Sequence, residues 1–427
     1  MSTTTNQPRA IGLFGFGVVG EALYQVLHRT PALQAHIKKV CIRDPQKVRN
    51  APAALFTTNR DELLQDPEIS IIIELIDDAT AAFEIVSTAL KNKKAVVSAN
   101  KKMIATQLNT LLELQRNYGT PFLYEAAACA SIPVIRNLEE YYDNDLLQSI
   151  SGIVNGSTNY ILTRIFEDKT DFETALHQAQ VAGFAESDPT LDISGQDAAN
   201  KLSILLTHAY GIIQPPHRII TQGIQALRPE DAVYAQEKGQ TIRLVAQAQK
   251  LKNGKVAALV LPQFVSPGSQ LYHVKDEFNG MVIESSLADR QFFYGKGAGG
   301  FPTASAVLSD LSALRYQYRY EYKKLRLQTP ATLSSDFYLR VYVSFDPLYQ
   351  APEIPFSHIL SYSSTEQRTQ VTGVLHCSQL SQSDWWKAEG ISLILLEDGI
   401  VETLSLSDER SRKRPHLERI LPLCTAV

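Results

Sequence analysis

Short apolar segments alternate with longer helical patterns over the first 130 residues of the chain. The apolar segments predict five buried strands, at residues 10–14, 39–44, 70–76, 95–98 and 122–125. Segments of helical periodicity follow, at residues 21–30, at 79–91 and after 103. Regular alternation of strands and helices is typical of a parallel, doubly wound sheet. We therefore expect an α/β domain at the start of the chain.

The pattern becomes irregular after residue 130. Strand-like segments are expected at residues 149–155, 256–260 and 280–284, and helical segments at 161–166, 172–182, about 197–209 and 230–249. A linker at 329–335 precedes further strand patterns at 337–345, 370–377 and 391–397. One hydrophobic core stops growing at about 250–300 residues, so the 427 residues imply several domains. We expect the first domain at 1–130 plus about 300–328, an α+β substrate domain at 131–299, and a small C-terminal α+β domain at 330–427.

Composition narrows the class of protein without identifying a function. The hydrophobic fraction of 44% and the charged fraction of 20% are ordinary for a globular protein. A formal net charge of −4 argues against a general nucleic-acid binder. The four cysteines lie far apart, which indicates reduced thiols rather than a zinc site or a disulfide framework. No signal-peptide pattern or membrane-spanning apolar run occurs, so we expect a cytoplasmic protein with no membrane partner.

A glycine-rich turn links the first predicted strand to the first predicted helix. It reads Gly15-Phe16-Gly17-Val18-Val19-Gly20, with the spacing G-x-G-x-x-G. In this context the first glycine makes the turn, the second admits a pyrophosphate and the third allows the helix to pack on the strand. The sequence therefore predicts a Rossmann-type domain that binds a dinucleotide, with Val18 and Val19 at the phosphates. A tight turn without a ligand is the alternative.

Two further strand ends carry candidate cofactor residues. Arg43 and Asp44 end the second strand about twenty residues beyond the glycines, where such folds contact the ribose. Asp44 suits a 2′-hydroxyl and Arg43 a 2′-phosphate, so we expect NADP, or use of both NADP and NAD. Lys101 follows the fourth strand, at the edge of the sheet where ligands bind. A solvated loop lysine is the alternative there.

The segment 183–206, GFAESDPTLDISGQDAANKLSILL, combines acids with one lysine. Asp197 and Lys201 have i, i+4 spacing, which places both side chains on one face of a helix. Glu186 and Asp192 precede that helix on a loop, where Asp188-Pro189 favours a turn. This arrangement suits two loop carboxylates and an oriented lysine around one small polar molecule. An ordinary surface ion pair is the alternative.

Three other segments allow a functional and a structural interpretation. Residues 125–133, EAAACASIP, suit either a cation held by backbone oxygens or close helix packing. The glycines at 295–300 suit either the ligand cleft or a hinge, and a chain returning to the first domain would cross there. The basic, tyrosine-rich segment 315–325 is expected to be a helix tail or spacer that packs on a neighbour, with Tyr316 and Tyr320 on one helix face. Binding of single-stranded nucleic acid is the disfavoured alternative.

Five motifs in order make the chain resemble homoserine dehydrogenases over about residues 10–315. They are GFGVVG, SANK, NGSTNYIL, GFAESDPTLDISGQDAANK and YGKGAGGFPTASAVLSDL. The resemblance implies NAD(P)-dependent interconversion of L-aspartate 4-semialdehyde and L-homoserine, in the biosynthesis of threonine, methionine and isoleucine. It also implies a homodimer formed through the middle domain.

The resemblance assigns a role to each candidate residue. Lys201 is expected to be the catalytic acid/base, with Asp197 as its partner and Lys101 as a second lysine at the nicotinamide and substrate. Glu186 and Asp192 are expected at the substrate amino group, with Ser157 nearby, and Gly299 at the cofactor. Backbone and side-chain oxygens of the segment would hold a sodium ion, through Glu125, Ala128, Ala130 and Ile132.

The chain departs from the family pattern in three places. Asp77-Asp78 replaces paired glycines after the third strand, close to the expected cofactor path. Ala130-Ser131 replaces a glycine pair in the cation segment. The C-terminal domain occupies the place of a regulatory ACT domain, but residues 345–356, FDPLYQAPEIPF, replace its usual acidic loop. A different dinucleotide-dependent amino-acid dehydrogenase, or a cofactor-sensing regulator with an inactive site, is the competing interpretation.

Overall fold

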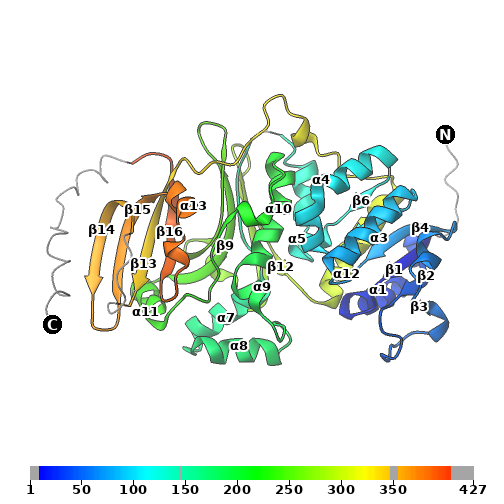
Figure 1. Cartoon of the computed structure of the whole chain (residues 1–427), viewed down its shortest axis with the longest axis horizontal. Helices are drawn as coiled ribbons and strands as arrows, with labels where there is room; N and C mark the ends of the chain where they lie inside the picture. The colour runs from blue at the N-terminus through cyan, green and yellow to red at the C-terminus, as the bar shows by residue number, and fades with distance from the viewer. Residues whose placement is uncertain (1–8, 145, 347–353, 405–427) are drawn as a thin grey trace.

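The computed structural model describes residues 9–144, 146–346 and 354–404 of the chain. Two sheets lie toward opposite ends of an elongated molecule, and helix α10 (Gln196–Tyr210) lies between them (Figure 1). None of the helices in the described ranges is long and apolar enough to cross a membrane. The expected basic run at 410–414 and Cys424 lie outside the described residues, as does most of the loop at 345–356.

The first sheet has six parallel strands in the order β3-β2-β1-β4-β5-β6. This is the order of a dinucleotide-binding Rossmann fold, so the predicted doubly wound sheet is confirmed. The strands are β1 (Arg9–Phe14), β2 (Ala35–Cys41), β3 (Phe56–Thr57), β4 (Ile69–Glu74), β5 (Ala95–Ser98) and β6 (Phe122–Leu123). The helices of this region are α1 (Val18–Arg29), α2 (Asp61–Leu64), α3 (Ala79–Lys91), α4 (Lys101–Tyr118), η1 (Pro31–Leu33) and η2 (Ala53–Leu55).

Helix α12 (Gly300–Arg315) returns from the second sheet and packs on α1 of the first domain. Its apolar residues Ala304, Val307 and Leu311 are buried in the same core as the parallel strands. The short helices α5 (Ala126–Cys129) and α6 (Val134–Glu140) connect the first sheet to the second. The expected crossing of the chain near residue 300 is therefore present.

The second sheet is mixed and runs β12-β11-β7-β9-β10-β16-β13-β15-β14, with β8 on β10. The strands of its middle part are β7 (Leu147–Ile153), β8 (Ile220–Thr221), β9 (Thr241–Lys250), β10 (Val256–Val265), β11 (Phe278–Ser285) and β12 (Asp289–Lys296). The accompanying helices are α7 (Gly156–Glu167), α8 (Phe172–Val181), α9 (Thr190–Ile193), α10, α11 (Pro229–Glu237), η3 (Pro216–Arg218) and η4 (Gln270–His273).

The C-terminal strands continue this second sheet. They are β13 (Tyr338–Phe345), β14 (Phe356–Ser364), β15 (Thr369–His376) and β16 (Ser392–Val401), with α13 (Ser378–Gln382) and η6 (Trp385–Lys387). β16 meets β10 in parallel at Leu395 and Gln263, and leucines of β10 share one core with β13, β15 and β16. The three expected C-terminal strands are confirmed, and Trp386 is buried in the core that they share with β10. The sequence did not predict β14.

Two predicted helices end earlier than expected. Residues 230–249 were expected to be helical, but α11 ends at Glu237, Gly239 has a φ of +68°, and strand β9 follows. The alanines and glutamines of β9 favour helix in isolation, but pairing with β7 and β10 on both sides overrides that preference.

Residues 316–322 do not extend a helix either, because α12 ends at Arg315 and Gln317 and Tyr322 have positive φ angles. Tyr320 and Tyr322 are instead buried against Tyr124 of the first domain. The segment continues into η5 (Lys323–Arg326). The expected packing on a neighbour is present, while the expected shared helix face is not.

Candidate active site

The glycine turn after β1 is shaped to receive a ligand at Gly17. Gly15 has a φ of +91°, and a Cβ there would lie 2.6 Å from the carbonyl oxygen of Leu75. A Cβ on Gly20 would lie 2.4 Å from the carbonyl oxygen of Gly15. A Cβ on Gly17 would meet nothing within 4 Å, so the backbone there faces open space at the start of α1. Val18 and Val19 open that helix, with Val18 76% exposed. These features fit a dinucleotide pyrophosphate.

The start of α12 lies beside this turn. A Cβ on Gly300 would lie 2.9 Å from the carbonyl oxygen of Val18. Gly299 precedes the helix with a φ of +112°, which L side chains rarely adopt. The second glycine cluster therefore lies beside the first glycine turn, although the two are far apart in the sequence.

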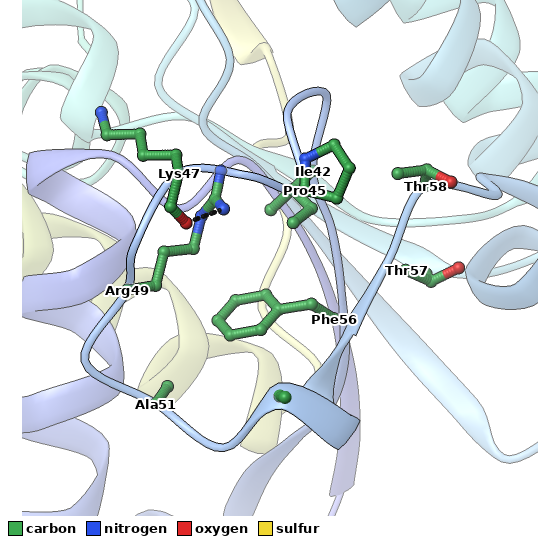
Figure 2. Close-up of a pocket in the computed structure, with 9 residues that line it drawn as sticks. Ile42, Pro45, Lys47, Arg49, Ala51, Phe56, Thr57 and Thr58 are labelled. Atoms are coloured by element: carbon green, nitrogen blue, oxygen red, sulfur yellow. Dashed lines mark hydrogen bonds between the residues drawn. The ribbon is translucent and has the colours of Figure 1, made fainter.

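A cavity of about 460 Å³ lies at the end of β2 (Figure 2). Its lining includes Lys47, Arg49 and Phe56, and the Arg49 guanidinium lies 5.5 Å from the centre of the Phe56 ring. Arg43 is exposed just after β2, and Asp44 accepts a hydrogen bond from the backbone of Gln46. The sequence analysis identified Arg43 but missed Lys47 and Arg49, which follow in an irregular loop.

Asp77 and Asp78 follow β4 close to the glycine turn. Asp78 caps α3 by accepting hydrogen bonds from the backbone N–H groups of Thr80 and Ala81, both at 2.9 Å. Asp77 is exposed. The departure from the family's glycines therefore supplies a helix cap at one of the two positions.

Lys101 is the first residue of α4, and Asn100 holds the start of that helix. The Asn100 side chain accepts from Met103 N at 2.9 Å and donates to the carbonyl of Ile76 at 2.9 Å. Below it, Ser98 donates to the buried carboxylate of Glu74 at 2.6 Å. Burial raises the pKa of Glu74 to about 7. These hydrogen bonds hold the backbone at the start of α4 in place, and with it the position from which the Lys101 side chain extends.

Asp197 joins the two lysines that the sequence placed apart. Its Oδ2 lies 2.8 Å from Nζ of Lys201, and its Oδ1 lies 2.8 Å from Nζ of Lys101. The first pair is the expected i, i+4 pair on one face of α10. The Lys201 side chain is 8% exposed and also donates to the carbonyl of Val154 at 2.5 Å, whereas the Lys101 side chain is 44% exposed.

The opposite charges of Asp197 and the two lysines stabilise the ionised form of Asp197 and of Lys101. Burial opposes ionisation of Asp197, but the charges of Lys101 and Lys201 outweigh it and hold the pKa of Asp197 below its ordinary value. The charge of Asp197 in turn raises the pKa of Lys101, with smaller contributions from Asp192 and Glu186. The site therefore holds an ionised aspartate and a charged Lys101 at neutral pH.

The loop before α10 places its acids around the two lysines. Glu186 is exposed, and Asp192 is partly buried on α9. Asp188 accepts from the backbone N–H and hydroxyl of Thr190, which is the expected turn. Ser157 donates to the carbonyl of Phe184 at 2.6 Å and so connects the start of α7 to this loop.

Asn155 is a site residue that the sequence analysis missed. Its amide nitrogen donates to Asp192 at 2.7 Å and to Asp197 at 2.8 Å. The available signal was a polar residue at the predicted end of a strand, within the motif NGSTNYIL. That position marks a helix cap as readily as a site residue.

The Glu125 segment offers backbone rather than carboxylate oxygens to a cation. The carboxylate of Glu125 accepts hydrogen bonds from the backbone N–H groups of Ile135 and Arg136, both at 2.9 Å. Ala130 has a φ of +45°, which reverses the chain between Ala128 and Ile132. No group of three or more His, Cys, Asp or Glu side chains suited to a metal occurs among the described residues. A cation here would depend on the carbonyl groups.

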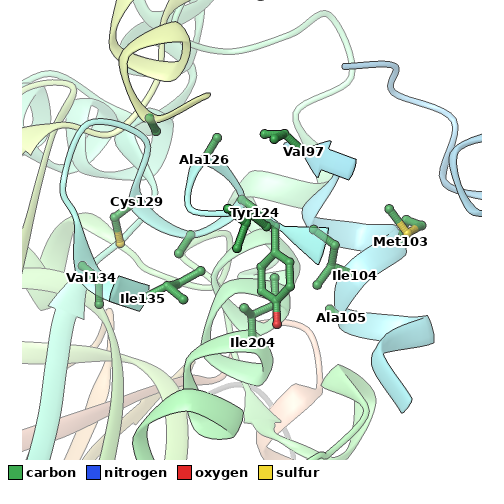
Figure 3. Close-up of a cluster of buried hydrophobic side chains, with 14 of the residues drawn as sticks. Val97, Met103, Ile104, Ala105, Tyr124, Ala126, Cys129, Val134, Ile135 and Ile204 are labelled. Atoms are coloured by element: carbon green, nitrogen blue, oxygen red, sulfur yellow. The ribbon is translucent and has the colours of Figure 1, made fainter. Parts of the chain in front are cut away.

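Helix α10 is held rigidly beneath the site. Every residue from Asp197 to Tyr210 is buried, and Ile204 packs near Tyr124, Cys129 and Ile135 (Figure 3). Farther along the helix, His208 bonds to Glu139 at 2.6 Å and to Tyr124 at 2.9 Å. His208 is therefore a core residue, and it ties the C-terminal end of α10 to Glu139 and Tyr124.

This arrangement can transfer a proton to an oxygen atom that lies within reach of the Lys201 ammonium. A lysine ammonium has three N–H donors, and among the described residues Lys201 uses two of them, on Asp197 and Val154. One donor remains for a substrate oxygen. The two loop acids, Glu186 and Asp192, suit a substrate that carries an ammonium group.

Family models match most of the chain. Residues 15–125 match the model described as homoserine dehydrogenase, NAD binding domain, and residues 133–312 match the model described as homoserine dehydrogenase. The first range covers β2 to β6 of the first sheet, and the second range covers β7 to β12 of the second sheet and most of α12.

Curated relatives and solved structures agree with these models. The chain is 32% identical to the homoserine dehydrogenase of Bacillus subtilis over 352 residues, covering 78% of this chain and 81% of the relative. It is 36% identical to that of Synechocystis over 311 residues, covering 70% and 72%. A homoserine dehydrogenase structure from Thiobacillus denitrificans superposes with a TM-score of 0.80 at 30% identity, covering 92% and 98%. The chain belongs to the homoserine dehydrogenase family.

Proposed function

We propose that Lys201 is the acid/base residue of the reaction of this family, the NAD(P)-dependent interconversion of L-aspartate 4-semialdehyde and L-homoserine. The single observation that supports this role is the buried Lys201 ammonium, which Asp197 and Val154 fix while its third donor has no partner among the described residues. A reduced nicotinamide supplies a hydride to the aldehyde carbon, and the carbonyl oxygen then needs a proton. Lys201 donates that proton from a fixed position, and Asp197 orients the ammonium.

The substrate's charged groups match the remaining side chains. Glu186 and Asp192 bind the ammonium of the substrate, and Ser157 holds their loop through the carbonyl of Phe184. Lys101 binds the substrate carboxylate beside the nicotinamide. Its partial exposure and its position at the start of α4 support this role.

We also propose that NADP is accepted and that its 2′-phosphate lies at the end of β2. Arg43, Lys47 and Arg49 bring three basic side chains to that strand end, and the phosphate turn uses Gly15, Gly17, Gly20 and Gly299. A hyperthermophilic archaeal homoserine dehydrogenase solved in complex with NADPH superposes with a TM-score of 0.62 at 26% identity. Comparison of NADPH and NADH oxidation tests this preference, and a marked preference for NADH contradicts it.

Lys201→Met tests the central role. We expect the rate of NADPH oxidation with aspartate semialdehyde to fall about 10²- to 10⁴-fold, the usual contribution of acid–base catalysis. Cofactor binding, followed by NADPH fluorescence, should persist because Lys201 lies away from the glycine turn. Lys38→Met is the control, since Lys38 forms surface pairs with Asp66 and Glu68. A Lys201→Met enzyme with wild-type turnover would contradict the assignment.

We propose a sodium ion at the backbone oxygens of Glu125, Ala128, Ala130 and Ile132. The positive φ of Ala130, in a segment of small residues, supports this proposal because the backbone there departs from helix geometry and does not continue α5. Activity at constant ionic strength, with potassium replacing sodium, tests this role.

The proposed homodimer uses the edge strand β12. This strand pairs with β11 on one side, and its Phe292 and Tyr294 side chains are 38% and 52% exposed. An exposed edge strand with aromatic side chains is typical of a surface that another chain covers. Light scattering of the wild type and of Tyr294→Lys tests the dimer.

We also propose a regulatory role for residues 330–427. The C-terminal strands are joined to the middle domain by a buried group in which Asp231 accepts from Tyr342 and Ser344, with Arg368 3.8 Å away. A threonine effect would therefore act through a rigid contact. Activity in millimolar threonine tests it.

A cytoplasmic location is proposed from the free thiols Cys41, Cys129 and Cys377, and cell fractionation tests it.

A further inference from the structure

Asn155 lies between two carboxylates that come from different elements. Its Nδ2 donates to Oδ1 of Asp192 on α9 at 2.7 Å and to Oδ2 of Asp197 on α10 at 2.8 Å. Asn155 is 5% exposed, and Asp197 is buried. Each of the two amide hydrogens therefore serves a different acid.

The orientation of this amide is fixed by its oxygen. Oδ1 of Asn155 accepts a hydrogen bond from the backbone N–H of Thr158 at 2.8 Å and so caps α7. If the amide were reversed, its oxygen would face two carboxylates and its nitrogen would face an N–H donor. The NH₂ group must therefore point at Asp192 and Asp197.

We propose that Asn155 is a positioning residue that couples substrate recognition to proton transfer. It holds Asp192 toward the ammonium of the substrate and Asp197 toward Lys201 with a single amide group. The inference rests on the roles proposed above for Asp192, Asp197 and Lys201. Asp192 and Asp197 therefore do not act independently, because the same amide group holds both.

A neutral donor is suited to this position. Oδ2 of Asp197 accepts from both Lys201 and Asn155, while Oδ1 faces Lys101, so the carboxylate cannot rotate freely. Asp192 is held by an amide rather than by a lysine. Its negative charge is therefore not cancelled by its holder and stays available for an ammonium group.

The competing interpretation is that Asn155 only caps α7. Asn155→Ser and Asn155→Asp separate the two roles, because serine and aspartate are both good cap residues but neither donates to two carboxylates. Asp171→Ala is the matched control for the loss of a cap. Asp171 caps α8 through Thr174 N at 2.9 Å and has no contact with Asp192 or Asp197.

The test measures kcat and KM for aspartate semialdehyde, together with melting temperature and NADPH affinity. We expect Asn155→Ser to lower kcat/KM about 10- to 100-fold, the range for hydrogen bonds to charged groups. The loss should include a higher KM, through Asp192, and a lower kcat, through Asp197. NADPH affinity and melting temperature should stay close to wild type, whereas Asp171→Ala should lower only the melting temperature.

Asn155→Asp adds a readout that a structural role would not move. Three adjacent carboxylates repel one another, so the introduced acid should take up a proton as the pH falls and then donate to one neighbour. Its activity relative to wild type should rise toward acidic pH. Wild-type kcat and KM in both Asn155 variants would overturn the coupling. If Lys201→Met is inactive in that case, the proposed function stands and only this inference fails; if Lys201→Met is fully active, the proposed function fails as well.

Discussion

Asp197 and Asp310 are both buried aspartates, but their surroundings shift their pKa values in opposite directions. Asp197 lies between two lysines, each 2.8 Å away, and its pKa falls below its ordinary value despite burial. Asp310, on α12, is paired with Arg136 at 2.8 Å and accepts from the backbone of Glu125 at 3.0 Å. Burial raises the pKa of Asp310 to about 7, against the charge of Arg136.

The difference lies in the balance of charges rather than in burial. At the active site, two ammonium groups face one carboxylate. At the junction between the two domains, one guanidinium faces two acids, and burial together with the Asp310 charge raises the pKa of Glu125 to about 8. The active site therefore keeps its aspartate ionised throughout the neutral range. At the junction, the raised pKa values allow Asp310 or Glu125 to be protonated at neutral pH.

The largest effect is expected where the charge balance serves the reaction. Asp197→Asn leaves two neighbouring ammonium groups without a countercharge. We expect kcat to fall about 10²- to 10⁴-fold, the usual contribution of acid–base catalysis, because the acid/base lysine loses the carboxylate that orients it. The pKa of Lys101, which Asp197 raises, should fall. The alkaline limb of the pH–rate profile should then move to lower pH, which steady-state kinetics from pH 6 to 10 can measure.

Asp168→Asn is the matched control for this change. Asp168 forms an i, i+4 pair with Arg164 at 2.8 Å, with the same spacing along its helix as Asp197 and Lys201, but on the surface. Exposed pairs of this kind contribute about 0.3–0.5 kcal/mol. Its turnover should remain at the wild-type level. Equal activity in both variants would show that the buried pair is only structural.

A smaller effect is expected for the exposed member of the lysine pair. Lys101→Met removes the proposed contact to the substrate carboxylate and one of the two charges on Asp197, so kcat/KM should fall about 10- to 100-fold, mainly through KM. Lys102→Met changes the exposed neighbour on the same helix and should have no effect. Initial rates over a range of aspartate semialdehyde concentrations measure the difference. A fall in kcat with an unchanged KM would contradict the binding role of Lys101 and would indicate that it takes part in the chemical step.

Local contacts of this site were predictable from the sequence, and distant contacts were not. The i, i+4 spacing of Asp197 and Lys201 predicted their contact, and the glycine spacing predicted the turn at Gly17. The pairing of Lys101 with Asp197 joins two domains, so no local pattern reports it. The position of Lys101 after a parallel strand made it a candidate at the ligand-binding edge of the sheet, and the family resemblance then assigned it to the nicotinamide and substrate.

The errors in the fold have the same physical origin. Strand β9 is rich in alanine and glutamine, and its structure is decided by the strands on both sides rather than by its own propensity. Tyr320 and Tyr322 were expected on a helix but are held by the distant residues Tyr124 and Glu139. Sequence reasoning succeeded where neighbours along the chain decide the structure and failed where tertiary packing does.

The smallest effect on activity, and the sharpest contrast in pH dependence, is expected at the junction. In the folded protein Asp310 takes up a proton near pH 7, whereas in the unfolded chain it does so near pH 4. Between these values the folded state binds more protons, so the stability contributed by this group is present below about pH 4 and is lost as the pH rises to about 7. The loss can reach about 1.4 kcal/mol per pH unit for one proton.

Asp310→Asn should remove this dependence, because an amide does not titrate and Glu125 loses a neighbouring charge. The variant should be less stable overall by about 1–3 kcal/mol, since the amide oxygen can accept from only one of the two donors, Glu125 N–H and Arg136, and the amide nitrogen then faces the other. Its urea midpoint should nevertheless fall less than that of the wild type between pH 5 and pH 7, while turnover stays within a few-fold. Asp197 has the opposite sign, because its lowered pKa gives stability that is lost only as the pH falls below about 4. An unchanged pH dependence in Asp310→Asn would place the proton elsewhere in the junction and remove the contrast with Asp197.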